Sequence, residues 1–424
     1  MEAARRAAFF AAGATMADNG PITAAEVFVL LVAASVVVAV FTRRSALLPY
    51  SVALVVLGLA VSVLNLPIEI EIGPDFLLAV LLPGLVFDAA YRTDIRVLGS
   101  TLPAVAFLAV PGVLITAGAV AAALAVLTGL DPGLAFLAGT MLAATDPAAV
   151  ISVMGHVRAP KRLTTLIEAE SLFNDGTGIV IFAIALEAIR VDVAPIEMVT
   201  GLLATIVISL LVGTAIGILA IRALVLVEDR LVELTISLVA AYGSYFLADR
   251  LGQSGLIATV VCGLVFGSYG RRAMDNGSEA AIDVVWEFIG FLTTTAVFLL
   301  VGLAISFDQL GRAAFPALIA GVALLLARGV MVYLLVGGGS HLMERLSWAK
   351  HLPASWLHLI AWSGLRGAVS VALALSLPPD LPQRDLLQGI VFACVLMTLL
   401  VNGTTAGPLV RRLGLSVEEH GSSG

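Results

Sequence analysis

The stretch ESLFNDGTGIVIF, residues 170–182, places four polar side chains directly before a run of apolar residues. Ser171 and Asp175 are four residues apart, as are Glu170 and Asn174, so on a helix the four side chains form two neighbouring stripes. The rest of the stretch is apolar on nearly every side. If this helix lies in a membrane, the polar wedge must face the interior of the protein and not lipid.

The composition indicates that most of the chain does lie in a membrane. It has 424 residues, of which 60% are hydrophobic and only 12% are charged. Soluble domains carry about 25% charged residues, and half of that share cannot cover a soluble surface of this size. A net charge of −7 argues against a nucleic-acid-binding protein. Cys262 and Cys394 lie in separate apolar runs without metal-ligand spacing, which predicts two small buried side chains.

The apolar runs predict an all-α polytopic membrane protein of about 13 transmembrane helices, because a spanning helix needs roughly 20 mostly apolar residues. The predicted spans are 22–42, 46–64, 74–91, 99–128, 132–155, 162–189, 195–226, 230–249, 254–269, 281–305, 312–336, 355–377 and 385–410.

Basic residues predict how these spans are oriented. When loops are taken alternately, one side holds fifteen Lys and Arg residues and the other holds six. The richer side is cytoplasmic by the positive-inside rule, so the N-terminus is expected outside and the C-terminus inside. The fifteen are Arg43, Arg44, Arg92, Arg96, Arg158, Lys161, Arg162, Arg222, Arg230, Arg271, Arg272, Arg345, Lys350, Arg411 and Arg412.

The two chain ends are set aside from the functional interpretation. Residues 1–21 are read as an N-terminal extension, either a signal peptide or sequence upstream of a start at Met16. Residues 411–424 are expected to form a short cytoplasmic tail.

Two basic residues, Arg328 and Arg366, fall inside predicted spans, and so do several carboxylates. Placing an ionisable side chain inside a membrane costs free energy unless it has a partner or faces a water-filled cavity. Such residues are therefore candidate functional residues. The acidic residues within spans or near their functional ends are Asp88, Asp146, Glu170 and Asp175.

The stretch ATDPAAV, residues 144–150, predicts a broken helix. Pro147 lacks an N–H and clashes with the preceding turn, so nearby carbonyls lose their helical donors. Thr145 and Asp146 then lie where the second half-helix begins. Such a break offers backbone oxygens to a cation, whereas the half-helix N-terminus favours an anion such as Asp146.

A second break is predicted at 362–373, where Gly364 and Gly367 flank Arg366. The two breaks fall in the fifth and twelfth spans, which run in opposite directions. This pattern predicts two inverted repeats of six spans, 22–189 and 230–410, joined by a linker helix at 195–226, with the two broken helices crossing at an ion site. Arg366 is expected to neutralise Asp146 or to offset the facing half-helix C-termini.

Six motifs in this order resemble the NhaP-type sodium/proton antiporters, in the superfamily branch that includes the animal sodium/proton exchangers. The resemblance covers about residues 22–412. The motifs are LLPGLVFDAAY at 81–91, ATDPAAV at 144–150, ESLFNDGTG at 170–178, VFLLVGLAI at 297–305, the mid-span Arg328 and GLRGAVS at 364–370.

The resemblance implies that Asp175 alternately carries a cation and a proton. Ser171, Asp146 and the backbone carbonyl of Thr145 would coordinate or shape the site. Asn174 stands where electrogenic relatives have a second Asp, which implies electroneutral exchange.

Three further residues have roles by the same resemblance. Asp88 matches an acidic position of the third span, so Na⁺ would be bound by Asp175, Ser171, Thr145 and Asp88. Glu170 and Arg328 match a structural ion pair between the sixth and eleventh spans. The motif often has two prolines in the family, and Gly84 stands in place of the second.

The chemistry fits these residue types. Na⁺ is a hard ion that prefers oxygen ligands. Carboxylate, hydroxyl and backbone carbonyl groups all provide such oxygens. A buried carboxylate is costly unless it holds a proton or a cation, so the two ligands exclude each other on one group. The protein is therefore expected to exchange cytoplasmic Na⁺ or Li⁺ for H⁺ by alternating access and to serve pH homeostasis, without a cofactor and not as an enzyme.

The resemblance also implies a homodimer in the plasma (inner) membrane of a prokaryote, with spans 4–6 and 11–13 moving against the others. Its expected partners are membrane lipid, monovalent cations and protons, and not nucleic acid. Three alternatives remain open: a potassium/proton antiporter, a channel or non-transporting sensor, and an intramembrane aspartyl protease with Asp146 and Asp175 as its dyad.

Overall fold

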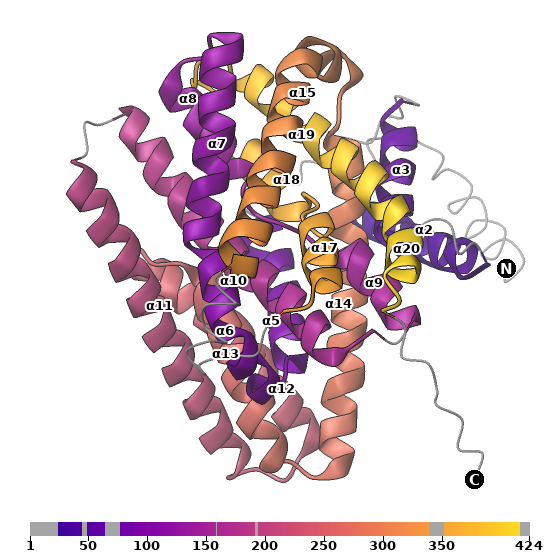
Figure 1. The fold of residues 1–424 in the computed structure, drawn as a ribbon. Coiled ribbons are helices and arrows are strands. Elements are labelled where there is room, and N and C mark those ends of the chain that lie inside the picture. Colours follow the sequence, from indigo (N-terminus) through magenta and orange to yellow (C-terminus); the bar gives the residue numbers. More distant parts are fainter. Residues whose placement is uncertain are drawn as a thin grey trace, which may run out of the picture.

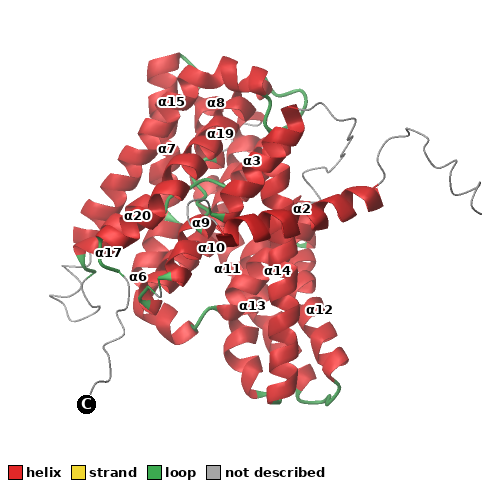
Figure 2. Ribbon diagram, turned by 90° about the vertical axis from the view of Figure 1, so that its right-hand side faces the viewer, coloured by secondary structure: helices red, strands yellow, loops and turns green. Residues whose placement is uncertain are grey.

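The computed structural model is an all-helical bundle (Figures 1 and 2). It describes residues 24–44, 49–63, 77–157, 159–190, 194–338 and 352–415, and no strand occurs in these ranges. Of the sequence predictions, the extension 1–21, Arg158, Arg345, Lys350 and the tail after residue 415 lie outside the described residues.

The helices pack in two groups. We call the first the α5 group, because α5 carries its part of the site; it comprises α2 (Ala24–Arg44), α3 (Tyr50–Val63), α5 (Leu82–Arg92), α11 (Pro195–Leu224), α12 (Arg230–Arg250), α13 (Gly255–Tyr269) and α14 (Asn276–Ala304). In Figure 2, α12, α13 and α14 extend below the rest of the molecule.

The second group is called the α10 group. It comprises α6 (Ile95–Ala109), α7 (Pro111–Thr128), α8 (Pro132–Met141), α9 (Ala148–His156), α10 (Lys161–Arg190), α15 (Phe307–Gly329), α17 (Ala354–Trp362), α18 (Ala368–Leu375), α19 (Arg384–Thr398) and α20 (Thr404–Arg412). Short π-helical turns precede α5, follow α15 and join α19 to α20.

Local sequence sets many of the helix starts. Asp131 accepts hydrogen bonds from the backbone N–H groups of the first turn of α8, and Asp229 does the same for α12. Proline stands in the first turn of α7, α8 and α11, where its missing N–H costs nothing. These caps explain why the apolar runs fold into separate helices and not into longer continuous ones.

The membrane character of the chain is visible in its helices. Among the described residues, seven helical segments are long and apolar enough to cross a membrane: 95–128, 161–190, 196–224, 230–250, 277–304, 307–337 and 384–412. Each of the other six predicted spans also contains helix: α2 covers most of the first as one 21-residue helix, and the other five hold shorter or interrupted pieces. The chain is thus a multi-pass helical membrane protein, and the count of thirteen spans stays a prediction.

Small residues allow close contact inside the α5 group. A Cβ atom on Gly58 of α3 would collide with the backbone of Leu299, and one on Gly302 of α14 would collide with the backbone of Val55. Because lipid gives helices little hydrophobic reason to associate, such close backbone packing holds membrane helices together. Substitution of either glycine would separate α3 from α14.

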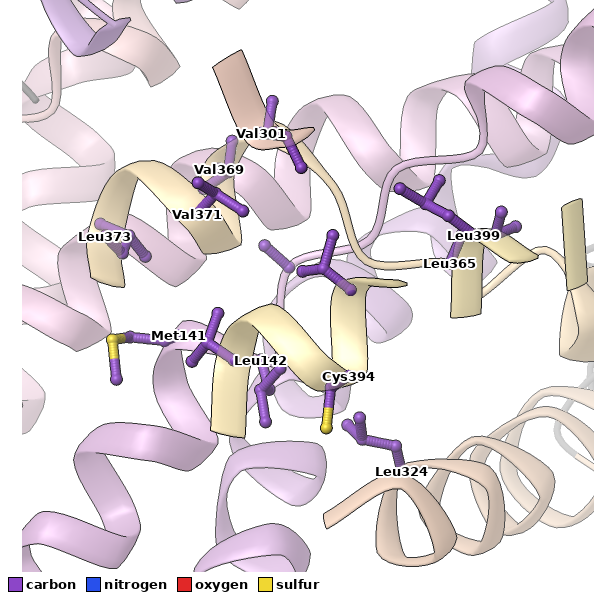
Figure 3. Close-up of a cluster of buried hydrophobic side chains, with 14 of the residues drawn as sticks. Met141, Leu142, Val301, Leu324, Leu365, Val369, Val371, Leu373, Cys394 and Leu399 are labelled. Carbon is purple, nitrogen blue, oxygen red and sulfur yellow. The ribbon is translucent and has the colours of Figure 1, made fainter. Parts of the chain in front are cut away.

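The α10 group has an apolar core around its broken helices (Figure 3). Side chains from α8, α15, α18 and α19 meet there, and Val301 of α14 joins them from the α5 group. Cys394 is part of this cluster, and both Cys262 and Cys394 are free and buried, as the sequence predicted. The residues labelled in Figure 3 are Met141, Leu142, Val301, Leu324, Leu365, Val369, Val371, Leu373, Cys394 and Leu399.

Candidate functional site

Two helices of the α10 group are interrupted, and the interruptions meet. Residues 142–147 separate α8 from α9, and residues 363–367 separate α17 from α18. The backbone N–H of Asp146 donates to the carbonyl of Leu365 over 2.9 Å, so the two breaks are joined main chain to main chain. The breaks therefore lie where Pro147 and the glycines of 364–367 predict them, and they cross. The inverted-repeat relation between the halves remains a prediction.

Neighbouring helices satisfy the open backbone of the second break. Thr398 of α19 accepts a hydrogen bond from the N–H of Arg366 over 3.0 Å, and Asn402 donates to the carbonyl of Trp362 over 3.1 Å. Irregular backbone is tolerated at membrane depth only with partners of this kind. These two polar residues therefore stabilise the break rather than mark a second site.

Asp146 lies at the beginning of both second half-helices. Its carboxylate accepts a hydrogen bond from the N–H of Ala148 over 3.0 Å, and the N–H of Ala368 lies close enough to interact with it. Gly367 packs so closely that a Cβ atom there would overlap the carboxylate. Two half-helix N-termini thus converge on one anion, the arrangement that helix dipoles favour.

No ion pair joins Arg366 to Asp146, both of which the structure describes. Its guanidinium is almost completely buried and donates to the carbonyls of Gly364 over 2.7 Å and Leu365 over 3.5 Å. These carbonyls follow the C-terminal end of α17, where the helix dipole favours a cation. Arg366 was expected to neutralise Asp146 or to offset the facing half-helix C-termini, whereas its hydrogen bonds go to carbonyls of its own break.

Asn174 joins the first break to α10. Its side-chain oxygen accepts from the N–H of Thr145 over 3.2 Å, and its amide nitrogen donates to Thr145 Oγ1 over 2.6 Å and to Glu170 Oε1 over 2.9 Å. Ser171 Oγ donates to the carbonyl of Thr145 over 2.6 Å. The polar wedge on α10 therefore holds residue 145 through its N–H, its hydroxyl and its carbonyl.

Glu170 and Arg328 form a buried ion pair with two parallel contacts. Arg328 Nη1 lies 2.8 Å from Glu170 Oε1, and Nη2 lies 2.9 Å from Oε2. Arg328 also donates to the carbonyl of Ile360, near the end of α17. The side chains of Glu170 and Arg328 are only 2% and 5% exposed, so neither charge has water as a substitute partner.

Asp175 differs from these residues because nothing in the described part of the chain donates a hydrogen bond to it or pairs with it. Its carboxylate lines a cavity of about 280 Å³, and the carboxylates of Asp146 and Glu170 lie near enough to repel it. A buried anion without a counter-charge is costly. The geometry therefore leaves Asp175 open to a proton or a cation.

The cavity lies between the two helix groups. One wall is α5, which contributes Asp88 and Arg92. The opposite wall belongs to the α10 group and contains Thr145, Asp146, Glu168, Ser171, Asp175 and residues 367–370. Asp88 thus faces the same cavity as Asp175 from the other group, and it is already bound to Arg92, whose Nε lies 2.7 Å from Asp88 Oδ1.

Two cavity residues were missed at the sequence level. Glu168 was grouped with acidic residues at span ends, although it precedes Ser171 by three residues and Asp175 by seven, which puts all three on one face of α10. Arg92 was counted only as a cytoplasmic charge. The helical spacing could have identified Glu168, whereas the contact of Arg92 with Asp88 becomes significant only once the cavity is known.

Glu168→Gln is expected to raise the KM for Na⁺ about threefold to tenfold, since the substitution removes one of the negative charges that attract cations into the cavity. The maximal exchange rate should change little. The measurement is sodium-dependent proton flux in proteoliposomes. Glu187→Gln, on an exposed position of the same helix, is the matched control, and an unchanged KM in Glu168→Gln would contradict this role.

An aspartyl protease is not supported by this geometry. Among the described residues no hydrogen bond links Asp146 to Asp175, whereas a catalytic dyad shares a proton between its carboxylates. Asp146 is instead engaged by the half-helix N–H group of Ala148. In the same ranges no group of three or more His, Cys, Asp or Glu residues is arranged to hold a metal ion.

A multi-pass helical membrane protein has the architecture of a secondary ion transporter when two broken helices cross beside a carboxylate that, as here, no described residue pairs with. The chain belongs to the sodium/hydrogen exchanger family, whose transmembrane-region model matches residues 27–412. The family consists of transporters and not of enzymes, and the NhaP-type resemblance seen in the sequence is confirmed.

Individual relatives agree with this placement. The chain is 34% identical over 398 residues to the low-affinity Na⁺/H⁺ antiporter NhaS1 of Synechocystis, covering 92% of this chain and 75% of that one. It is 36% identical over 351 residues to the Na⁺/H⁺ antiporter NhaP of Pseudomonas aeruginosa, covering 80% and 81%. The fold resembles the solved sodium proton antiporter MjNhaP1 of Methanocaldococcus jannaschii, with a TM-score of 0.73, 21% identity and coverage of 92% and 98%.

Proposed function

We propose that this protein is an electroneutral Na⁺/H⁺ antiporter in which Asp175 carries either one cation or one proton. The observation that carries this proposal is the Asp175 carboxylate, which lines a cavity between the two helix groups and has no hydrogen-bond or ion-pair partner among the described residues. Family membership and the similarity to proteins described as Na⁺/H⁺ antiporters support it.

The neighbours of Asp175 fit a cation with oxygen ligands. Within the described ranges the carbonyl of Thr145 accepts one hydrogen bond, from Ser171, which leaves a second lone pair. The hydroxyl of Ser171 keeps its acceptor lone pairs as well. Together with the Asp175 carboxylate these groups offer the hard oxygen ligands that Na⁺ prefers.

The state of the polar groups around Asp175 supports the exchange of one cation per proton. Asn174 cannot titrate, and Glu170 is bound to Arg328 on both of its oxygens. Asp146 is stabilised as an anion by half-helix N–H groups. Asp175 is therefore the group in this wedge that is free to exchange its ligand.

Alternating access would consist of movement of the α10 group against the α5 group. The cavity lies between the groups and reaches Arg92 and Glu168, at the ends of α5 and α10 that the charge pattern assigns to the cytoplasm. This corresponds to an inward-open state, with the N-terminus outside in a prokaryotic plasma membrane. A homodimer would form through the α5 group, whose α11 exposes Leu203, Val207 and Leu211.

The decisive experiment is transport by purified protein in liposomes with an imposed pH gradient. Addition of Na⁺ or Li⁺ is expected to change the internal pH at a rate that does not depend on a voltage clamped by K⁺ and valinomycin. A voltage-dependent rate would contradict the electroneutral exchange. Flux with K⁺ instead of Na⁺ would assign potassium/proton exchange, and absence of flux with every cation would leave a sensor.

A further inference from the structure

The Asp88–Arg92 pair occupies one wall of the ion cavity. Arg92 Nε lies 2.7 Å from Asp88 Oδ1, and Arg92 Nη2 donates to the carbonyl of Asp283 on α14 over 3.0 Å. Both partners belong to the α5 group, so the guanidinium is held by that group alone. The side chains of Asp88 and Arg92 are 17% and 38% exposed, and both line the cavity.

The position of this pair matters because the cavity has few positive charges. Among the described residues that line it, four are carboxylates, namely Asp88, Asp146, Glu168 and Asp175, and Arg92 is the single basic one. A guanidinium is permanently charged and binds a carboxylate with directed N–H groups. The Arg92 guanidinium therefore acts as a cation already bound to Asp88. A Na⁺ ion that enters the cavity must either displace it or bind beside its positive charge.

We propose that Arg92 is an affinity-determining residue of the ion cavity: its guanidinium occupies Asp88 and thereby weakens the binding of Na⁺ from the cytoplasmic side. This inference rests on the cation/proton exchange proposed above. Arg92 does not carry the ion and does not titrate; it sets how much negative charge the cavity presents to an arriving cation. The Asp88 carboxylate is present in the cavity but is neutralised in this state.

The test compares Na⁺-dependent proton flux of wild type and Arg92→Gln in proteoliposomes at one fixed pH. The variant is expected to lower the KM for Na⁺ about fivefold to tenfold, because one positive charge has been removed from the cavity wall. The maximal rate should stay close to that of wild type. A merely structural pair would lower the maximal rate or the melting temperature and would leave the KM unchanged.

Three controls separate the outcomes. Arg96→Gln removes the same charge from an exposed residue outside the cavity and should leave the KM unchanged. Arg92→Lys keeps the charge and should remain near the wild-type KM. Asp88→Asn combined with Arg92→Gln should lose the gain in affinity, because the released carboxylate is absent.

The proposal is overturned if wild type exchanges Na⁺ for H⁺ and the Arg92→Gln variant has an unchanged or higher KM for Na⁺. If wild type moves no cation, the proposed function fails instead, and the role of Arg92 falls with it. If Arg92→Gln does not fold, Arg92→Met, which removes the same charge, takes its place: a lowered KM would support the proposal, and an unchanged or higher KM would overturn it.

Discussion

Asp175→Asn is expected to abolish sodium/proton exchange while the protein still inserts and folds. Asn has nearly the same size as Asp, but it carries no charge and cannot release or take up a proton. Loss of a buried charged partner costs about 2–5 kcal/mol in binding, which corresponds to about 30-fold to several thousand-fold in affinity. Flux in proteoliposomes should therefore fall to the level of empty liposomes.

The fold should survive this substitution, because the Asp175 carboxylate has no hydrogen-bond or ion-pair partner in the described part of the chain. Neutralising it also relieves repulsion from Asp146 and Glu170. We expect an equal or higher melting temperature in detergent than for wild type. Asp308→Asn, at an exposed surface pair with Arg312, is the matched control and should retain full exchange. Retained exchange in Asp175→Asn would refute the carrier role.

Local sequence rules were sufficient for the elements of the site but not for all of its contacts. Pro147 cannot continue a helix, so the break at 142–147 could be predicted from one residue. The i, i+4 spacing of Glu170 and Asn174 likewise predicted a shared stripe, and the two side chains are in contact. These features depend on backbone geometry within one helix.

Contacts between distant segments were harder to predict. Arg366 was expected to reach Asp146 or a facing half-helix, yet it binds the carbonyls of its own break, because these lie two residues or fewer away and need a cation. Asp146 needs no arginine, since two half-helix N-termini supply its positive potential. Which of several partners a buried charge selects depends on tertiary packing, and a hydropathy pattern contains no such information.

The division into two helix groups also could not be predicted from the hydropathy pattern. Spans 4–6 and 11–13 were assigned to one moving unit only by family resemblance, and the helices of those spans do pack together as the α10 group. Nothing in the apolar runs distinguishes a helix that moves from one that is fixed. The significance of Arg92, likewise, depends on the cavity between the two groups, which the apolar runs do not predict.

Arg328→Met is expected to destabilise the protein by about 3–5 kcal/mol, since it leaves the Glu170 carboxylate buried without its counter-charge. The double variant Glu170→Gln with Arg328→Met should recover a large part of this loss. The Gln side chain can still accept the hydrogen bonds that Asn174 and Thr145 donate to Glu170, and no orphaned charge remains. Melting temperatures of the two single variants, the double variant and wild type, measured in the same detergent, provide the comparison.

The exposed pair of Asp308 and Arg312 serves as the control for this cycle, because a surface ion pair contributes only about 0–1 kcal/mol. Arg312→Met should therefore melt close to wild type. If the double variant melted at the same temperature as Arg328→Met or below it, the orphaned charge would not be the cause of the loss. Recovery of both stability and exchange in the double variant would assign the Glu170–Arg328 pair to holding α10 against α15 and α17, and leave ion exchange to Asp175.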